Sequence, residues 1–330
     1  MRIILSKEPF DIPATGWMQQ GWPAKWIGHP EVQGAEPMVT AYRKRFSPDK
    51  DARIRIHVSA DERYDLFLDG KRIGRGPERG DRENWHYESY DLDLKAGKHT
   101  LVARTWWLGS NGPAPYAQHT VRPGFLLAAE GVPEELLNTG KVAWDCKVLG
   151  GYRWVHPGSA WGTGAKVHIV GAEFPWGFEN GAGDGWVRAQ IIAPAANATI
   201  ANEFPLVWLL RPATLPPPID KAVHAGEARH VQAVTSDDTR PIQVKQADHL
   251  ASEVEEWNRL LQGKSSITIH PNTMRRVIVD LGNYYCAYPE VVLSGGKGSK
   301  VRVHWAEALY EQPEGGSKGN RDQIEGKYFI

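Results

Sequence analysis

The sequence has little cysteine, no net charge and no long apolar run. Only two cysteines, Cys146 and Cys286, occur in 330 residues, which excludes a disulfide-stapled fold, and neither has metal-ligand spacing around it. We expect two free, buried thiols rather than one disulfide. A formal net charge of zero argues against the large basic surface of a nucleic-acid-binding protein. No window is apolar enough for a membrane span, so neither nucleic acid nor membrane is expected as a partner.

Targeting signals and short catalytic motifs are also missing. Residues 1–9 lack the apolar run of a secretory signal. We expect a cytoplasmic location if Met1 is the native start, and a periplasmic or secreted one if a leader has been removed. The sequence contains no GxGxxG, P-loop, HExxH or nucleophile-elbow motif, so no catalytic centre can be assigned from a motif.

Tryptophan and turn-forming residues are plentiful. There are 14 tryptophans, and 34 glycines with 23 prolines give 57 turn-forming residues, a share that suits a fold with many turns. An indole offers a flat apolar face and one N–H donor. It serves either as core packing in a β-sandwich or as a platform on which a sugar ring stacks, and we expect both uses here.

The first half of the chain alternates apolar and polar residues with a period of two. Asp69-Gly70 separates two such runs, which is a strong hairpin signal. No helical period lies between the runs, and short strands at this spacing indicate a sandwich or jelly roll. The predicted strands cover residues 52–60, 63–68, 71–74, 85–92, 98–107, 125–129 and 143–148.

The second half predicts another all-β domain with one helix. The helix is expected over 249–261, with Asp248 as N-cap and Gly263 as its stop. The prolines of Leu215–Ile219 form a stiff connector, so we place a leader arm at 1–21, a first β-sandwich with a long aromatic loop at 22–213, and a second at 214–330. The fold class is therefore all-β, with two antiparallel β-sandwich, jelly-roll-like domains and one short decorating helix. Strands are expected near 230–234, 266–269, 276–282, 289–293 and 300–305.

Several segments resemble the N-terminal β-sandwich region of bacterial α-L-rhamnosidases, glycoside hydrolase family 78. The order and spacing of the segments carry this resemblance, which covers about residues 22–330. The segments are Trp22-Pro23-Ala24-Lys25-Trp26-Ile27-Gly28, residues 68–74, residues 87–92, Val279-Asp280-Leu281-Gly282-Asn283-Tyr284, residues 295–298, residues 305–310 and residues 318–322.

In that family the sandwiches precede an (α/α)6 barrel, which carries the two carboxyl groups of an inverting hydrolysis of terminal α-L-rhamnosides. No helical array for such a barrel occurs in this sequence, so no catalytic residue is assigned. The end at Tyr328-Phe329-Ile330 leads us to expect a chain that stops before the barrel. The resemblance implies a non-catalytic region that contacts a rhamnose-containing glycan and supports the barrel of the same parent chain. The alternatives are a free-standing lectin-like protein and a structural assembly module.

The first candidate site is the loop 80–86. Carboxylate and amide oxygens beside an indole suit a sugar, and we name Asp81, Arg82, Asn84 and Trp85. Some modules of the resembled family hold calcium in such a loop, and Asp81, Glu83 and Asn84 are hard oxygen donors. Calcium is thus the one cofactor that the resemblance suggests. A solvated loop that leads into a strand is the alternative.

Two further aromatic groups are candidates for sugar contact. One follows a strand end and contains Trp106, Trp107, Asn111 and Tyr116; since neighbouring strand residues face opposite ways, only one of its two tryptophans can face the surface. The other lies in the glycine-rich loop and contains Trp176 and Trp186. The alternative for all of these residues is core or loop packing.

Overall fold

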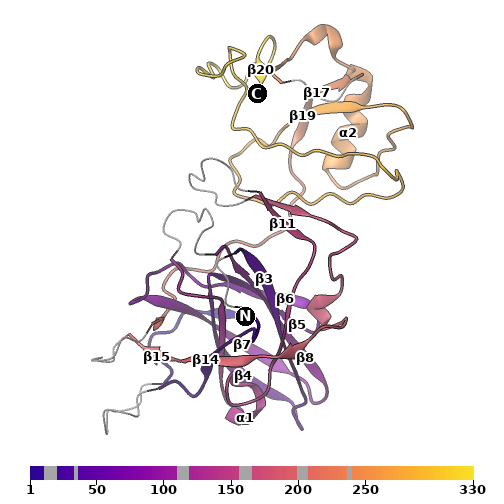
Figure 1. Cartoon of the computed structure of the whole chain (residues 1–330). Helices are drawn as coiled ribbons and strands as arrows, with labels where there is room; N and C mark the ends of the chain where they lie inside the picture. The colour runs from indigo at the N-terminus through magenta and orange to yellow at the C-terminus, as the bar shows by residue number, and fades with distance from the viewer. Residues whose placement is uncertain (11–20, 33–35, 110–118, 156–165, 199–206, 236–239) are drawn as a thin grey trace. The chain divides into compact units, whose positions relative to one another are not determined.

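The computed structural model describes the chain except for residues 11–20, 33–35, 110–118, 156–165, 199–206 and 236–239. It contains two compact units, Met1–Pro218 and Ile219–Ile330, called unit 1 and unit 2 below (Figure 1). In the described residues of both units most of the regular structure is antiparallel strand, as the sequence predicts. No helix among them is long and apolar enough to cross a membrane.

Unit 1 is a sandwich of two sheets. The first sheet has the order β14-β2-β9-β4-β7-β16-β15, with β1 also paired to β7, and the second has the order β13-β10-β3-β8-β5-β6. The strands of the first sheet are β1 (Arg2–Ile3), β2 (Lys25–Gly28), β4 (Ala52–Asp61), β7 (Trp85–Leu94), β9 (Gly124–Glu130), β14 (Gln190–Pro194), β15 (Ala196–Asn197) and β16 (Leu209–Pro212). Those of the second are β3 (Met38–Phe46), β5 (Arg63–Leu68), β6 (Lys71–Gly76), β8 (His99–Trp107), β10 (Asp145–Val148) and β13 (Val187–Arg188).

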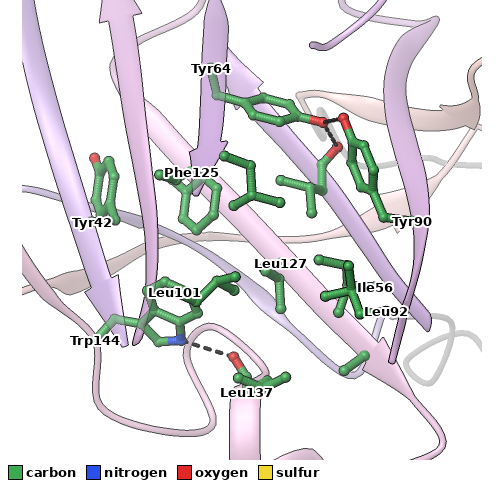
Figure 2. Packing of buried hydrophobic residues seen from close by; sticks show 14 of the residues in the cluster. Tyr42, Ile56, Tyr64, Tyr90, Leu92, Leu101, Phe125, Leu127, Leu137 and Trp144 are labelled. Carbon is green, nitrogen blue, oxygen red and sulfur yellow. Dashed lines mark hydrogen bonds between the residues drawn. The ribbon is translucent and has the colours of Figure 1, made fainter. Parts of the chain in front are cut away.

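The core between the two sheets follows from the alternation of each strand. On β4, Ile54, Ile56, Val58 and Ala60 face this core and are at most 2% exposed. Figure 2 shows how the two sheets meet around Phe125, which stacks on Tyr42 at 5.2 Å. Trp144 packs beside Phe125 and donates its indole N–H to the Leu137 carbonyl at 2.9 Å, at the end of the short helix α1 (Glu134–Leu137).

The predicted strands of the first half are confirmed, and so is the hairpin at Asp69-Gly70. Asp69 and Gly70 both have positive φ, 50° and 79°, which is the conformation of a two-residue type I′ turn. The sequence did not predict β3, because apolar residues occupy both of its faces and no period of two remains. The leader arm predicted at 1–21 was assigned no strand, and its residues 2–3 form β1 on the edge of β7.

Both sheets are also covered on their outer faces. One cluster, with Trp22, Trp26, Trp85 and Trp208, lies on the outer side of the first sheet. The other contains Phe178 and lies on the outer side of the second sheet. It is covered by the loop region with the hairpin β11 (Tyr152–Val155) and β12 (Lys166–Ile169) and the turn η1 (Phe178–Asn180). Most of the tryptophans that the structure describes in unit 1 therefore belong to these outer covers, whereas Trp144 lies between the sheets.

In unit 2, the described strands pair two by two. β17 (Glu227–Ala233) pairs with β19 (Arg275–Asp280), and β18 (Ile242–Gln243) with β20 (Tyr328–Phe329). The first pair confirms the strands predicted near 230–234 and 276–282. The helix α2 (Val254–Leu261) follows the short turns η2 (Gln246–Asp248) and η3 (Ala251–Glu253).

Several predictions for unit 2 were wrong. Helix α2 ends at Leu261 as expected, and the stop at Gly263, with φ 68°, is confirmed, but the helix begins five residues later than expected and its N-cap position is Glu253 rather than Asp248. The segments 266–269, 289–293 and 300–305 are not strands. Alternation alone does not make a strand, because the backbone N–H and C=O groups need a paired neighbour. Cys286 is exposed rather than buried, whereas Cys146 is buried and both thiols are free, as expected.

Candidate functional site

An aromatic surface covers the outer face of the second sheet. It consists of Trp106, Tyr152, Trp154, Phe174 and Trp176. Trp106 projects outward from β8, and its ring lies edge-on to Tyr152 at 5.3 Å and to Trp154 at 5.7 Å. Phe174 lies 5.7 Å from Tyr152 and 4.8 Å from Trp176. The rings therefore form one continuous group that runs from the sheet to the solvent.

Trp176 is the exposed end of the aromatic surface. It is 75% exposed, in contrast to the half-buried Trp106 and Trp154. Its indole N–H is already bonded to the Gly171 carbonyl at 2.8 Å, so the ring is held in place while its face stays open to solvent. A fixed, flat apolar face with few rotamers costs little entropy when it binds a ligand.

Polar groups neighbour members of the aromatic surface in the chain: Arg153 lies between Tyr152 and Trp154, and Glu173 precedes Phe174. Arg153 of β11 and Glu173 form an ion pair with side chains about half exposed, which contributes little to stability and leaves both heads open to a ligand. Deeper in the cluster, Arg104 is bonded to Asp65 and lies 5.3 Å from the Trp106 ring centroid. The aromatic surface therefore combines an apolar platform with charged hydrogen-bonding groups of both signs at its rim.

Two of the predicted tryptophans lie inside the protein. Trp85 is 4% exposed and donates to the Ala60 carbonyl at 3.3 Å. Trp107 is 3% exposed and donates to the Thr120 hydroxyl at 2.6 Å. Their ring faces are covered by other side chains, so the assignment of a sugar contact does not extend to them.

The other predicted aromatic residues lie at different places. Trp106 and Trp176 belong to the aromatic surface. Trp186 is half-buried at another edge of the same outer cover, with the guanidinium of Arg43 4.2 Å from its centroid. Asn111 and Tyr116 fall outside the described residues. The structure thus brings together only part of the predicted set.

The loop around Asp81 is closed by its own hydrogen bonds. One oxygen of Asp81, Oδ1, accepts the backbone N–H groups of Glu83 and Asn84 and the Asn84 side-chain amide, at 2.8 to 2.9 Å. The bond from Asn84 is the main cause of a lowered pKa at Asp81. Arg82 and Glu83 are exposed.

The same loop offers little to a calcium ion. Calcium takes six to eight oxygen ligands, and Asp81 uses one of its two oxygens for the loop itself. Among the described residues, no three His, Cys, Asp or Glu side chains are close enough together to hold a metal. The residues that the structure describes therefore do not by themselves make a calcium site, and calcium binding stays a prediction.

A buried acid pair at the end of β4 was not predicted from the sequence. Asp61 is 0% and Glu62 2% exposed. Asp61 accepts four hydrogen bonds, from the Thr120 hydroxyl, the backbone N–H groups of Val121 and Arg122, and the Trp208 indole. Burial raises the pKa of Asp61 to about 6 against the effect of these bonds.

Glu62 has fewer hydrogen-bond partners than Asp61. Its Oε2 accepts the Leu108 N–H at 3.1 Å, while its Oε1 is buried without a partner. Burial, together with the charge of Asp61, raises the pKa of Glu62 to about 8. At neutral pH this carboxyl is therefore mostly protonated. Its only sequence signal was a pair of acids directly after an apolar strand.

A serine, a histidine and a glutamate meet on the outer face of the first sheet, also unpredicted. His57 Nδ1 lies 2.8 Å from Ser89 Oγ, and Nε2 lies 2.7 Å from Glu130 Oε1. Burial lowers the pKa of His57 although Glu130 opposes it. This is the residue set of a hydrolase triad, but Ser89 is 3% exposed and the His57 ring is covered by Phe10. We read the trio as internal hydrogen bonding.

Comparisons with known proteins show a likeness of fold. No protein-family model matches the chain, and no curated protein sequence does. A rhamnosidase of family GH78 from Bacillus sp. GL1 matches with a TM-score of 0.53 and 22% identity over 69% of this chain and 22% of its own. An α-L-rhamnosidase from Dictyoglumus thermophilum (TM-score 0.41, 17% identity, 69% and 29% covered) and a Pleurotus ostreatus lectin (0.32, 18%, 58% and 46%) match less closely. The chain spans about a fifth of the Bacillus protein.

Proposed function

We propose that this chain is a non-catalytic region of an α-L-rhamnosidase-like glycoside hydrolase, where it contacts carbohydrate and supports the rest of the enzyme. The likeness of fold to the Bacillus rhamnosidase, over 69% of this chain, supports the family. The family implies a catalytic barrel that acts on terminal α-L-rhamnosides, and this barrel would be the partner of the chain. A fold alone does not fix a function, so the case for sugar contact rests on the aromatic surface.

The observation that carries the proposal is the exposed face of Trp176. The C–H face of a sugar ring is apolar and flat enough to stack on an indole, while its hydroxyl groups need donors and acceptors at the edge. Arg153 donates and Glu173 accepts within the same exposed ion pair. The hydroxyl groups of a neutral sugar can form hydrogen bonds with both side chains, and neither charge would then be buried without a partner.

Replacing Trp176 by alanine should weaken glycan binding by at least about tenfold, since truncating an aromatic anchor costs roughly 1–2 kcal/mol or more. The free energy of unfolding should hardly change, because the ring is 75% exposed. The measurement is calorimetric titration with L-rhamnose and rhamnose-containing oligosaccharides, with and without calcium. The matched control is Tyr288→Ala, which removes an 85% exposed aromatic ring from unit 2.

Equal losses in the Trp176→Ala and Tyr288→Ala variants would remove the aromatic surface from the proposal. Glycan binding that depends on Trp176, in a chain shown to occur without any barrel, would favour the alternative of a free-standing lectin-like protein. If the intact chain binds no glycan at all, the alternative of a structural assembly module is favoured.

The purified chain should release no product from aryl α-L-rhamnosides above the uncatalysed rate. An inverting glycosidase needs two carboxyl groups on either side of the bond, with room for water between them. Asp61 and Glu62, the buried acid pair found in the described residues, are adjacent in sequence and closed to solvent. The measurement is release of the chromogenic aryl group over a day at high protein concentration. Turnover that survives repeated purification would show that the chain itself carries a catalytic pair.

A further inference from the structure

The outer edge of β7 is filled by two short strands from opposite ends of unit 1. One side of β7 pairs with β4 over Glu88–Leu94. On the other side, β16 covers Trp85–Tyr87 and β1 covers Ser89–Tyr90. The Asp91 N–H also reaches the Met1 carbonyl at 2.9 Å. An open strand edge is a template on which another extended segment can pair, and here the amino-terminal segment takes that place.

Arg2 gives this docking its specificity. Its side chain is 10% exposed and its Nε is bonded to the carboxylate of Glu88, which is 4% exposed. Burial raises the pKa of Glu88 against the opposing effect of Arg2. Without the guanidinium, the donor that remains to Glu88 among the described residues is the Glu78 N–H at 2.9 Å. A buried carboxylate that loses its cation is strongly unfavourable, so the edge selects for arginine.

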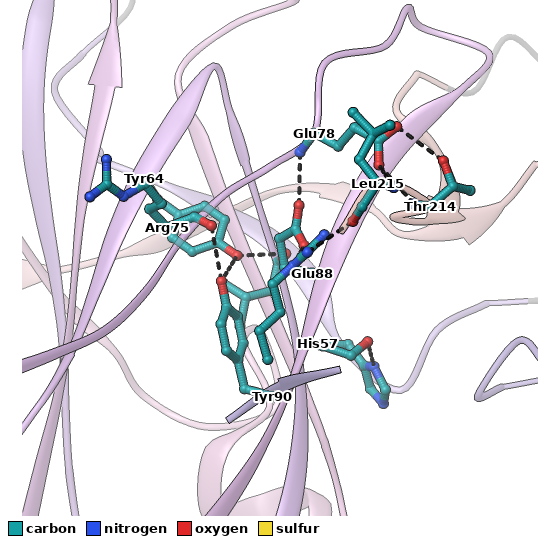
Figure 3. A network of polar contacts seen from close by, with 11 residues as sticks. His57, Tyr64, Arg75, Glu78, Glu88, Tyr90, Thr214 and Leu215 are labelled. Carbon is teal, nitrogen blue, oxygen red and sulfur yellow. Dashed lines mark hydrogen bonds and ion pairs between the residues drawn. The ribbon is translucent and has the colours of Figure 1, made fainter. Parts of the chain in front are cut away.

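The same arginine also reaches the connector at Leu215, and Figure 3 shows Leu215 and Thr214 beside Glu78. The NH1 group of Arg2 donates to the Leu215 carbonyl at 2.9 Å. Glu78 binds the backbone at the same place: its carboxylate accepts the N–H of Thr214 at 2.7 Å and that of Leu215 at 2.9 Å. The segment that pairs with the β7 edge is therefore joined to the connector by the hydrogen bond between Arg2 and Leu215.

A second anchor lies further along the same segment. Phe10 packs edge-on against Trp22 at 5.0 Å and against His57 at 5.4 Å. Leu5 packs on the same outer cluster. The segment thus places an arginine over a buried acid and a phenylalanine over an aromatic group, with strand pairing near the arginine. This combination of main-chain pairing and side-chain anchors is how extended peptides are recognised at sheet edges.

We propose that the outer edge of β7 is a docking site for an extended, arginine-containing peptide segment, and that residues 1–10 of the chain itself fill this site. The contacts that hold the segment are noncovalent and independent of its chain connection. The segment is therefore exchangeable with a free peptide of the same sequence. The proposal does not depend on the sugar-contacting role of the aromatic surface.

The test uses the full chain with a protease site inserted among residues 11–20 and cut after folding. We expect the cut segment to stay bound in gel filtration, and a fluorescent peptide of residues 1–10 to replace it in fluorescence anisotropy. A peptide with Arg2→Ala should bind at least about tenfold more weakly, since a hydrogen bond to a charged group contributes about 1.5–3 kcal/mol. Lys7→Ala is the matched control, because Lys7 is exposed, and should bind like the parent peptide.

A second measurement uses the uncut chain. In the Arg2→Ala variant, amide hydrogen exchange at Thr214 and Leu215 should become at least tenfold faster, while exchange in β4 stays slow. Dimers that form by exchange of this segment between two copies would also support the proposal, because the segment of the second copy would make the same contacts with the β7 edge. Equal affinities of the parent and Arg2→Ala peptides, or a cut segment that leaves a folded protein and does not rebind, would overturn it.

Discussion

Replacing Asp61 by alanine should lower the free energy of unfolding by about 3–5 kcal/mol, among the largest effects of a single change. The carboxylate accepts bonds from four donors that come from two distant parts of unit 1. Removing it leaves the buried Trp208 indole N–H and the part-buried backbone N–H groups of Val121 and Arg122 without this acceptor. Each such group costs about 1–3 kcal/mol. Urea unfolding followed by tryptophan fluorescence measures the loss.

Two variants separate hydrogen bonding from other effects of the Asp61 change. Asp61→Asn keeps one acceptor oxygen and should lose less than the alanine variant. Asp93→Ala removes an aspartate whose side chain is 89% exposed, and should change stability by less than about 0.5 kcal/mol. If Asp61→Ala is no more damaging than Asp93→Ala, the four hydrogen bonds do not stabilise unit 1.

Unit 1 should become less stable as the pH rises from about 4.5 to about 8. In the folded chain the pKa of Glu62 is raised from 4.5 to about 8, and that of Asp61 from 3.8 to about 6. Between the unfolded and folded pKa values the folded state holds more protons, so stability is greatest below the unfolded value and falls with pH. Since each pKa unit corresponds to about 1.4 kcal/mol, Glu62 alone accounts for roughly 5 kcal/mol.

Glu62→Gln tests this pH dependence directly. The amide keeps the acceptor for the Leu108 N–H and cannot ionise. The variant should therefore unfold at a higher urea concentration than the parent at pH 8.5, and its stability should depend less on pH. The control is Glu83→Gln, an exposed position that should leave the pH profile unchanged. A Glu62→Gln profile that runs parallel to the parent profile would show that Glu62 ionises without cost in the fold.

The strands of unit 1 were predictable because their alternation is a local property. Ile54, Ile56 and Val58 face the core and the residues between them do not, and the Asp69-Gly70 turn needs only its own backbone. In unit 2 the same kind of signal at 289–293 and 300–305 gave wrong predictions, since pairing depends on a neighbour that the local pattern does not specify.

The candidate site was harder to predict than the fold. Trp106 and Trp107 are adjacent and point to opposite faces, and the sequence does not tell which face a loop will cover. The burial of Asp61 comes from Trp208, 147 positions away. A contact between residues so far apart cannot be inferred from the pattern of residues around either one. The aromatic surface could be found in part, because Trp176 lies in a loop rich in glycine and aromatic residues, where an exposed ring is common.

The pairing of the first and last strands of unit 1 on β7 has a consequence for synthesis on the ribosome. Arg2 and Leu215, which are hydrogen-bonded in the structure, are 213 positions apart. The hydrogen bond between Asp61 and Trp208 likewise cannot form until the last part of unit 1 has been synthesised. Contacts of such long sequence separation slow folding. The part of the β7 edge at Trp85–Tyr87 stays unpaired until β16 has been translated, so unit 1 cannot complete its first sheet before the end of the unit has emerged.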